Sequence, residues 1–468
     1  MDTVGVKNEK FRDSIGTITE KGRRNWIYAK RPHGKLYSMR TVVSIVYLIV
    51  FFTLPWIKVH GEPLFMFNVI DRKFILFGMI FWPQDFFLFV LGMLTFVVFI
   101  VLFTVVFGRV FCGWVCPQTI FMEMVYRKIE YWIEGDSNHQ KRLSDGPWNQ
   151  EKMLKRSTKF IAFFTVSFVI ANYFLSYIVG MDTVMLYVKE GLMAHIGIFI
   201  PLIVFTLVFF MVYWRFREQA CLIVCPYGRL QGVMLDRNSI VVAYDYVRGE
   251  PRGKIKKIDE VKRGDCVDCM ACVHVCPTGI DIRNGTQLEC VNCTACIDAC
   301  DDVMGKIHRP TGLIRFASEN NIAQNQKVKF AVRIAAYSTV LVVLLAFLSF
   351  LLITRKEVQA NVMRVQGMLF QEQPNNKISN LYNIKLVNKT RHDVPVTLKL
   401  ENDDMKGEIK IVGNDLFVKK ESVGDGIFFV MVDKDNLHYR KQKIEIGVYS
   451  GDRRIDDVKI NFMGPGGI

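Results

Sequence analysis

Eight of the twelve cysteines form two closely spaced runs in the middle of the chain. The runs read CVDCMACVHVC from Cys266 to Cys276 and CVNCTACIDAC from Cys290 to Cys300, so each has the spacing Cys-x2-Cys-x2-Cys-x3-Cys. Thiolates with this spacing bind iron–sulfur cubes. Zinc is the alternative, but zinc sites usually take paired Cys-x2-Cys knuckles with a longer gap between them. The spacing therefore predicts two 4Fe-4S clusters.

The predicted ligands of the two clusters cross between the runs. In two-cluster ferredoxins the last cysteine of each run binds the cluster of the other run. We assign one cluster to Cys266, Cys269, Cys272 and Cys300, and the other to Cys290, Cys293, Cys296 and Cys276. Small residues between the ligands let backbone amides approach the sulfurs, and Pro277 turns the chain after the crossing ligand.

The other four cysteines form two pairs with one spacing. FCGWVCPQ contains Cys112 and Cys116, ACLIVCPY contains Cys221 and Cys225, and each pair follows a long apolar run. On a helix, residues four apart lie on one face with their Cα atoms roughly 6 Å apart. Such a pair could chelate one soft ion or close into a strained disulfide. The proline after each pair disfavours helix at the second cysteine.

Three interpretations of these pairs are open. Free cysteine often acts as a small buried hydrophobe, a dithiol can relay electrons, and thiolates select Cu(I) or a related soft metal. The identical spacing of the two pairs argues against simple buried hydrophobes, and we favour the soft-metal site because thiolates select Cu(I). The predicted metal ligands are Cys112, Cys116, Cys221 and Cys225, and the same four cysteines are the predicted catalytic residues. The pairs would form a single four-sulfur site if the apolar runs before them pack together.

Two methionines follow the first pair in the stretch FMEMVYRKIEYWIE. Met122 and Met124 could offer thioether ligands to a metal. A helical stripe that lies on the membrane accounts for them better, and we favour that interpretation.

The surrounding composition is typical of a polytopic membrane protein, with 51% apolar residues and a formal net charge of +15. A hydrocarbon core about 30 Å thick takes roughly 20 apolar residues to cross as a helix. Five stretches are long enough or nearly so, at 41–57, 86–107, 160–179, 196–213 and 334–353. We therefore predict about five membrane-spanning helices.

Lys and Arg distribute unevenly between the connecting segments. Ten precede the first span, nine lie between the second and third, and eighteen between the fourth and fifth, against three and one in the other two loops. The positive-inside rule then places the N-terminus and all twelve cysteines in the cytoplasm and residues 355–468 in the periplasm. Cysteines in a reducing compartment indicate no disulfide framework. This asymmetry also accounts for the net charge, so nucleic-acid binding is not indicated.

The C-terminal tail changes to a period of two. Stretches such as NLYNIKLVN, GIFFVMVD and QKIEIGVYS alternate apolar and polar residues, with Asn, Asp and Gly between them. Short strands at such intervals predict an antiparallel sandwich of about 100 residues, plausibly immunoglobulin-like, without a disulfide. No catalytic group is recognisable in it, which favours a docking role.

These patterns divide the chain into five predicted segments. They are a basic cytoplasmic segment 1–40; a four-span membrane domain 41–214 with an interfacial cytoplasmic loop 109–158; a cytoplasmic region 215–332 with a two-cluster ferredoxin domain at about 258–305; a fifth transmembrane helix 333–354; and a periplasmic sandwich 355–468.

Most of the chain resembles the FixG/CcoG/RdxA group of cytochrome c oxidase accessory proteins. The resemblance is carried by IYAKRPHGKLYSMRT, LPWIKVHGEPL, RKFILFGMIFWPQDFF, FGRVFCGWVCPQTIF, CLIVCPYGRLQ, the two cluster runs and GLIRFASEN. It implies a multi-pass protein of the bacterial inner membrane that supports assembly of a cbb-type oxidase, similar to an oxidoreductase that reduces Cu(II) and supplies Cu(I). Its partners would be copper ions and oxidase subunits or assembly factors.

Two other functions remain open. A quinol-oxidising electron-transfer subunit that feeds a periplasmic reductase also has paired Cys-x3-Cys-Pro motifs and two ferredoxin clusters. A redox-sensing scaffold without turnover would need the clusters but not the outlying thiols. The sequence leaves open the cytoplasmic electron donor, the side of copper release, the partner of the tail, and homo-oligomer formation.

Overall fold

We describe the fold from a computed structural model of the 468-residue chain. The described residues are 17, 24–59, 61–69, 73–82, 85–191, 193–254, 263–324, 332–365, 367, 369–374, 376–390, 392–401, 407–413, 415–420, 422–437 and 439–465. Most of the predicted basic segment 1–40, and residues 258–262 of the predicted ferredoxin domain, lie outside them. The chain divides into two compact units, 1–78 with 89–346, and 79–88 with 347–468.

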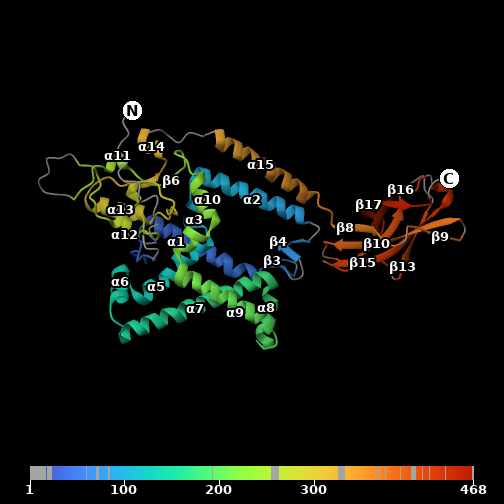
Figure 1. The fold of residues 1–468 in the computed structure, drawn as a ribbon, viewed down its shortest axis with the longest axis horizontal. Helices are drawn as coiled ribbons and strands as arrows, with labels where there is room; N and C mark the ends of the chain where they lie inside the picture. Colours follow the sequence, from blue (N-terminus) through green and yellow to red (C-terminus); the bar gives the residue numbers. More distant parts are fainter. Residues whose placement is uncertain are drawn as a thin grey trace. The chain divides into compact units, whose positions relative to one another are not determined.

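Within the described residues, five helices are long and apolar enough to cross a membrane, which confirms the predicted number. They are α1 (Lys35–Thr53), extended by a 3-10 turn η2 (Leu54–Trp56); α2 (Phe86–Phe107); α7 (Gln150–Val179); α9 (Ile196–Met211), extended by a π-helical turn η5 (Val212–Phe216); and α15 (Val332–Ile353). Helices α7 and α9 run side by side (Figure 1) and pack through aromatic rings, such as Phe174 and Phe205 with centroids 5.7 Å apart.

Helix α7 begins ten residues before the predicted start of its span, at Gln150. Asn149 caps its N-terminus, because the Asn149 side chain accepts a hydrogen bond from the Lys152 amide at 2.8 Å. The side chain of Lys159 is buried and pairs with Glu130 at 2.5 Å and Glu134 at 3.0 Å. These turns lie outside the predicted span because they carry four Lys or Arg, of which Lys159 is neutralised by Glu130 and Glu134 outside the helix.

Short helices and strands connect the spans. They are β1 (Lys58–Val59), β2 (Glu62–Pro63), β3 (Phe65–Asn68), β4 (Lys73–Leu76) and β5 (Met79–Phe81) after α1; α3 (Val110–Trp114), α4 (Pro117–Ile120), π-helical η4 (Phe121–Tyr126), α5 (Arg127–Glu134) and α6 (Ser137–Asp145) after α2; and α8 (Met181–Glu190) after α7. Tyr126 of η4 stacks on Tyr213 with ring centroids 4.4 Å apart.

Met122 and Met124 are 4% and 6% exposed. The predicted membrane-lying stripe is therefore wrong for these methionines, because protein covers both.

The cysteine-rich region is built on short elements around a small core. It contains π-helical η6 (Ala220–Val224), α10 (Pro226–Met234), β6 (Val241–Tyr244), α11 (Tyr246–Gly249), α12 (Ala271–His274), η7 (Ile282–Asn284), α13 (Ala295–Lys306), β7 (Ile314–Ala317) and α14 (Glu319–Gln324). Strands β6 and β7 pair antiparallel, with Val242 opposite Phe316. The buried core joins Val242, Val291 and Ile314 to buried cysteines of both runs and to Cys112.

The tail is all-β, as its alternating pattern predicted. Its elements are β8 (Val358–Arg364), β9 (Gln371–Gln373), β10 (Lys377–Asn388), β11 (Val394–Pro395), β12 (Thr397–Leu400), β13 (Gly407–Val412), β14 (Phe417–Val418), β15 (Val423–Asp433), η8 (Lys434–Asn436), β16 (Lys441–Ser450) and β17 (Arg453–Met463), orange to red in Figure 1. One sheet has the order β13-β15-β10-β8, with β9 also on β10, and another has β12-β16-β17. Alternate residues Phe428, Val430 and Val432 of β15 are fully buried in the core.

A buried carboxylate fixes the start of the tail. Asp85 accepts hydrogen bonds from Arg355 at 2.5 Å and from Lys389 at 2.6 Å, and it is 3% exposed. Burial alone would raise the pKa of Asp85, but its two cationic partners hold that pKa below the usual range. The pairing stabilises the packing of residues 79–88 with the sandwich.

Candidate metal centres

The two cysteine runs fold in the same way. In each run a left-handed residue stands on both sides of the second cysteine, Asp268 and Met270 in the first (φ 54° and 59°) and Asn292 and Thr294 in the second (φ 52° and 67°). A helix then begins directly after each, α12 and α13. A left-handed backbone conformation costs a non-glycine residue about 1 kcal/mol or more. Because both runs adopt it at the same two positions, we infer that this backbone conformation is needed around the second cysteine.

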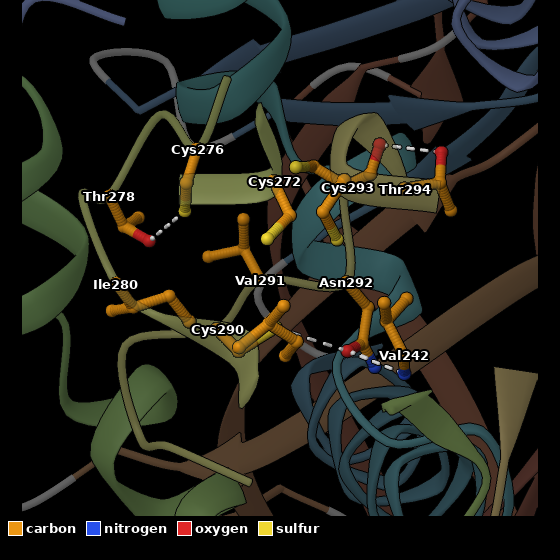
Figure 2. A pocket seen from close by; sticks show the side chains of 12 residues that line it. Val242, Cys272, Cys276, Thr278, Ile280, Cys290, Val291, Asn292, Cys293 and Thr294 are labelled. Atoms are coloured by element: carbon orange, nitrogen blue, oxygen red, sulfur yellow. Dashed lines mark hydrogen bonds between the residues drawn. The ribbon is translucent and has the colours of Figure 1, made fainter. Parts of the chain in front are cut away.

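Cysteines of both runs surround a cavity of about 20 Å³ (Figure 2). It is lined by Cys276, Cys290, Cys293 and Cys296, together with Cys272. The side chains of Cys272, Cys276 and Cys293 turn toward the space between them in Figure 2. The first four are the set that the crossed spacing assigns to one cluster.

A second cavity of about 20 Å³ lies beside the first, because Cys272 lines both. Its walls include Cys266, Cys269, Cys272 and Cys300, the set assigned to the other cluster. Of the twelve cysteines, all of which the structure describes, only Cys269 is classed as exposed. The first-run site therefore has the most accessible cysteine, while Cys276 and Cys290 of the other set are half-buried.

The surroundings of these thiols suit a cationic metal cluster. Burial raises the pKa of Cys272, Cys290 and Cys300 to about 12 and that of Cys293 to about 11. Thiols of this kind stay neutral until a metal displaces their protons. Four sulfur donors around each apolar cavity match the donor set of a 4Fe-4S cluster, so the residues present fit the predicted group.

Two polar side chains touch the sulfurs of one set. The Thr278 hydroxyl lies 3.3 Å from Cys276 Sγ, and Asn292 Oδ1 lies 3.5 Å from Cys290 Sγ. Asn292 Oδ1 also accepts a hydrogen bond from the Val242 amide at 3.2 Å. These contacts fix the positions of the two sulfurs relative to β6 and to the turn after Cys276.

Neither Cys-x3-Cys-Pro pair lies on a single helix, which corrects the geometry expected from the spacing. Cys116 (ψ 126°) and Cys225 (ψ 110°) leave the helical region just before the prolines that start α4 and α10. The amide of each donates to a carbonyl five residues earlier, Phe111 and Ala220, in both cases at 2.9 Å. Each proline keeps the cysteine before it out of the helical conformation, so the helix ends within the motif. The backbone ends in the same way at the second cysteine of both motifs.

The four thiols of the two pairs are close enough for their charges to interact. Burial raises the pKa of Cys112 to about 11, with further contributions from Cys116 and Cys225 that Arg109 opposes. Burial raises the pKa of Cys221 to about 12, with contributions from the other three thiols. The four thiols Cys112, Cys116, Cys221 and Cys225 therefore lie in one region, but no three metal-binding side chains of the described residues gather closely enough to hold an ion.

The first pair rests directly on the second run. A Cβ added to Gly113 would lie 2.3 Å from the carbonyl oxygen of Val291, so only glycine fits there. Trp114 Nε1 donates to the Asn292 carbonyl at 3.3 Å, and Arg40 Nε donates to the Gly113 carbonyl at 2.7 Å. The backbone beside Cys290 and Cys293 is therefore in contact with the backbone beside Cys112.

Comparisons with known proteins agree with this geometry. Residues 216–319 match a family described as a 4Fe-4S dicluster domain, residues 89–136 match a 4Fe-4S binding domain, and residues 348–465 match the IG-like fold at the C-terminus of FixG. Protein RdxB of Cereibacter sphaeroides is 34% identical over 384 residues, which cover 78% of this chain and 80% of RdxB. The nitrogen fixation protein FixG of Rhizobium meliloti is 32% identical over 434 residues, 82% of this chain and 80% of FixG. The chain belongs to the FixG/RdxA family.

Protein RdxA of C. sphaeroides is similar too, at 34% identity over 79% of this chain and 81% of RdxA. A crystal structure of a FixG-related protein from Vibrio parahaemolyticus matches 23% of this chain and 97% of its own, at 19% identity and a TM-score of 0.20, which is too low to inform the fold. This FixG-family chain is thus a membrane iron–sulfur electron-transfer protein with an immunoglobulin-like C-terminal domain.

Two side chains that hold the first pair of the FixG-family chain were not predicted as site residues. The Cys112 thiol donates to Gln231 Oε1 at 3.0 Å, and Arg109 Nε donates to the same oxygen at 3.2 Å. Arg109 is 2% exposed and also donates to the Leu288 carbonyl. Arg109 closely follows the second span and Gln231 lies six residues after Cys225. Because more than a hundred residues separate them in the chain, the sequence does not show that they are in contact.

The second pair of the FixG-family chain is held by a buried ionic network. Arg217 has φ 51° at the break between η5 and η6, and its guanidinium makes two hydrogen bonds to Glu130, at 2.8 and 3.0 Å. Burial alone would raise the pKa of Glu130, but Arg217 and Lys159 hold it well below the usual range. The network fixes an unfavourable backbone conformation four residues before Cys221.

Proposed function

We propose that this protein reduces Cu(II) and retains the Cu(I) product at its two Cys-x3-Cys-Pro pairs, for assembly of a cbb-type cytochrome c oxidase. The observation that carries the proposal is the contact of the first pair with the second run, through Gly113 against Val291 and Trp114 against Asn292. A copper ion at the pairs would lie beside the cysteines predicted to hold a 4Fe-4S cluster. Short separation between donor and acceptor favours electron transfer.

The chemistry of the pairs suits copper as substrate. Each Cu(II) ion takes up one electron and becomes Cu(I), and 4Fe-4S clusters held by the two predicted cysteine sets would supply single electrons. Four thiols of one neighbourhood provide soft donors, which select Cu(I) over harder metals. A bound copper ion displaces the thiol protons, which are released to solvent, and the soft thiolates that result retain Cu(I) more firmly than Cu(II).

The electron donor would approach the first-run site. Cys269 is exposed, whereas the second-run site is covered in part by residues 113–114 of the first pair. We place this face in the cytoplasm, from the excess of Lys and Arg in the segments that carry the cysteines. The sandwich domain would then lie in the periplasm and dock oxidase subunits or assembly factors.

The test begins with anaerobic purification of the full chain. We expect about eight iron and eight sulfide per chain, since there are two complete four-cysteine sets. Dithionite-reduced protein should convert Cu(II) to Cu(I), detected with a chromogenic Cu(I) chelator after removal of excess reductant. Replacing Cys112, Cys116, Cys221 and Cys225 together with Ser should leave iron content and cluster spectra unchanged.

The same quadruple variant should abolish Cu(I) binding and Cu(II) reduction. Reduction at the parent rate would mean that copper reacts elsewhere, directly at the clusters. The repeated motif would then have a packing role or serve a quinone-linked relay, and the proposed copper site would be wrong.

A further inference from the structure

A small cavity of about 30 Å³ lies beside the second run, because Val291 is part of its wall. Its walls include Cys221, Met122, Thr278 and Val291, and we call it the sulfur cavity. Thr278 and Val291 also line the cavity of Cys276, Cys290, Cys293 and Cys296. The sulfur cavity and the second-run cavity therefore share the wall formed by Thr278 and Val291, and Cys221 lies on the side of the sulfur cavity.

Two π-helical turns bring sulfur to this cavity. Met122 comes from η4 and Cys221 from η6. π-Helical turns are rare and occur frequently at functional sites, because the extra residue redirects the side chains. Met122 is 4% exposed, so its thioether contacts protein or the cavity contents and not solvent.

The ionised side chains around the sulfur cavity already have partners. Glu123 pairs with Arg127 at 3.1 Å, and Glu218 pairs with Arg24 at 2.8 Å. The third, Arg217, is bound by Glu130. A metal ion in the cavity would have to compete with these ion pairs for carboxylate oxygen, whereas the two sulfurs carry no such competing charge.

We infer that Met122 is a thioether ligand of a copper ion held at the second Cys-x3-Cys-Pro pair, where Met122 and Cys221 line the same cavity. The inference rests on the proposed copper function and adds a ligand to that site. Thioether sulfur is a soft donor that favours Cu(I) over Cu(II) and Zn(II), and it binds without releasing a proton. Met122 would thus favour the reduced ion at the wall next to the second run.

The chain supplies its own control for this inference. Met124 lies in the same π-helical turn and is 6% exposed, but it does not line the sulfur cavity, and its sulfur lies 4.0 Å from the Thr41 hydroxyl. Substituting Leu for either methionine keeps volume and apolar character, and such swaps usually cost less than about 1.5 kcal/mol. Any effect restricted to Met122→Leu is therefore due to its sulfur.

The experiment measures Cu(I) affinity of the full chain by competition with a Cu(I) chelator, together with X-ray absorption at the copper edge. Met122→Leu should lower Cu(I) affinity about tenfold, which corresponds to about 1.4 kcal/mol, and reduce the number of sulfur neighbours by one. Met124→Leu should match the parent in both measurements. Equal affinity and equal sulfur number in the two variants would overturn the inference.

Two further variants complete the test. If Met122→Leu loses its cluster absorption, Met122→Gln, which keeps an unbranched side chain, takes its place with the same expected results. The double variant Cys221→Ser with Cys225→Ser distinguishes an error in the thioether ligand from an error in the proposed copper function. If these serines abolish copper binding while Met122→Leu has no effect, only the thioether ligand is wrong. If the serines also leave binding unchanged, the proposed function itself fails.

Discussion

Replacing Gly113 with Ala tests the contact between the first thiol pair and the second run. The added Cβ would lie 2.3 Å from Val291 O and 3.1 Å from the carbonyl carbon and oxygen of Asn292. All three are backbone atoms, so no side-chain rotation can relieve the overlap. Contacts of carbon atoms below 3.0 Å are essentially absent from proteins, so the two segments must separate by at least 3.0 − 2.3 = 0.7 Å.

Two effects of this substitution oppose each other. Ala is favoured over Gly within a helix such as α3 by about 1 kcal/mol. Overpacking against fixed atoms costs about 1 to 3 kcal/mol. The cost of the overlap therefore equals or exceeds the gain in helix propensity. Because the net loss of stability is small, the protein should remain folded, with its first Cys-x3-Cys-Pro pair displaced. Since a misplacement of about 1 Å can cost a reaction about a hundredfold, we expect Cu(II) reduction to slow by about ten- to a hundredfold.

The assay compares the rate of Cu(I)-chelate formation by prereduced protein with iron content and cluster absorption. Gly92→Ala is the matched control, because Gly92 lies in α2 and an added Cβ there would meet nothing within 4 Å. It should behave as the parent. If Gly113→Ala kept the parent rate with intact clusters, the contact would not serve electron transfer, and the reasoning behind the proposed function would be refuted.

Three further predictions address the clusters, the topology and the ionic network. Cys300→Ser should damage the cluster bound mainly by the first run, as seen by EPR; loss of the second-run signal alone would contradict the crossed assignment. Reporter fusions at residues 280 and 420 should report inside and outside, respectively, and an inside signal at 420 would contradict the five-span topology. Glu130→Gln should lower the free energy of unfolding by about 3 to 5 kcal/mol, because it leaves the buried Arg217 without its carboxylate partner and Lys159 with Glu134 alone, and hence lower Tm. The surface variant Glu151→Gln should not change Tm, and equal Tm values for both variants would show that the network does not stabilise the fold.

The local features of this chain could be predicted from its sequence. The cysteine runs carry their ligand spacing within eleven residues, and the structure gathers the two predicted sets around two cavities. The strands of the tail follow from alternation, since a strand with one buried face must place apolar residues at every second position. The apolar helices follow from length and composition alone.

The contacts that join these features could not be predicted in the same way. Gly113 and Val291 lie far apart in the chain, and nothing near either residue indicates the other. The early start of α7 escaped hydropathy because its first ten residues include four Lys or Arg, and the local sequence does not show that Glu130 and Glu134 neutralise Lys159. The prediction that each thiol pair lies on a single helix was wrong. The proline after each pair takes the backbone of the second cysteine out of the helical region.

The exposure of Cys269 has a consequence for how this protein tolerates air. Oxidants attack accessible sulfur first, and oxidation beyond the sulfenic acid is largely irreversible. The other three cysteines of its set, Cys266, Cys272 and Cys300, are buried. Brief exposure to oxygen should therefore reach Cys269 before the buried ligands of its set, and before the half-buried Cys276 and Cys290 of the second-run set. Oxidised Cys269 would no longer hold its corner of the first-run site, so air damage should begin at the face where the proposed electron entry lies, before it reaches the buried ligands.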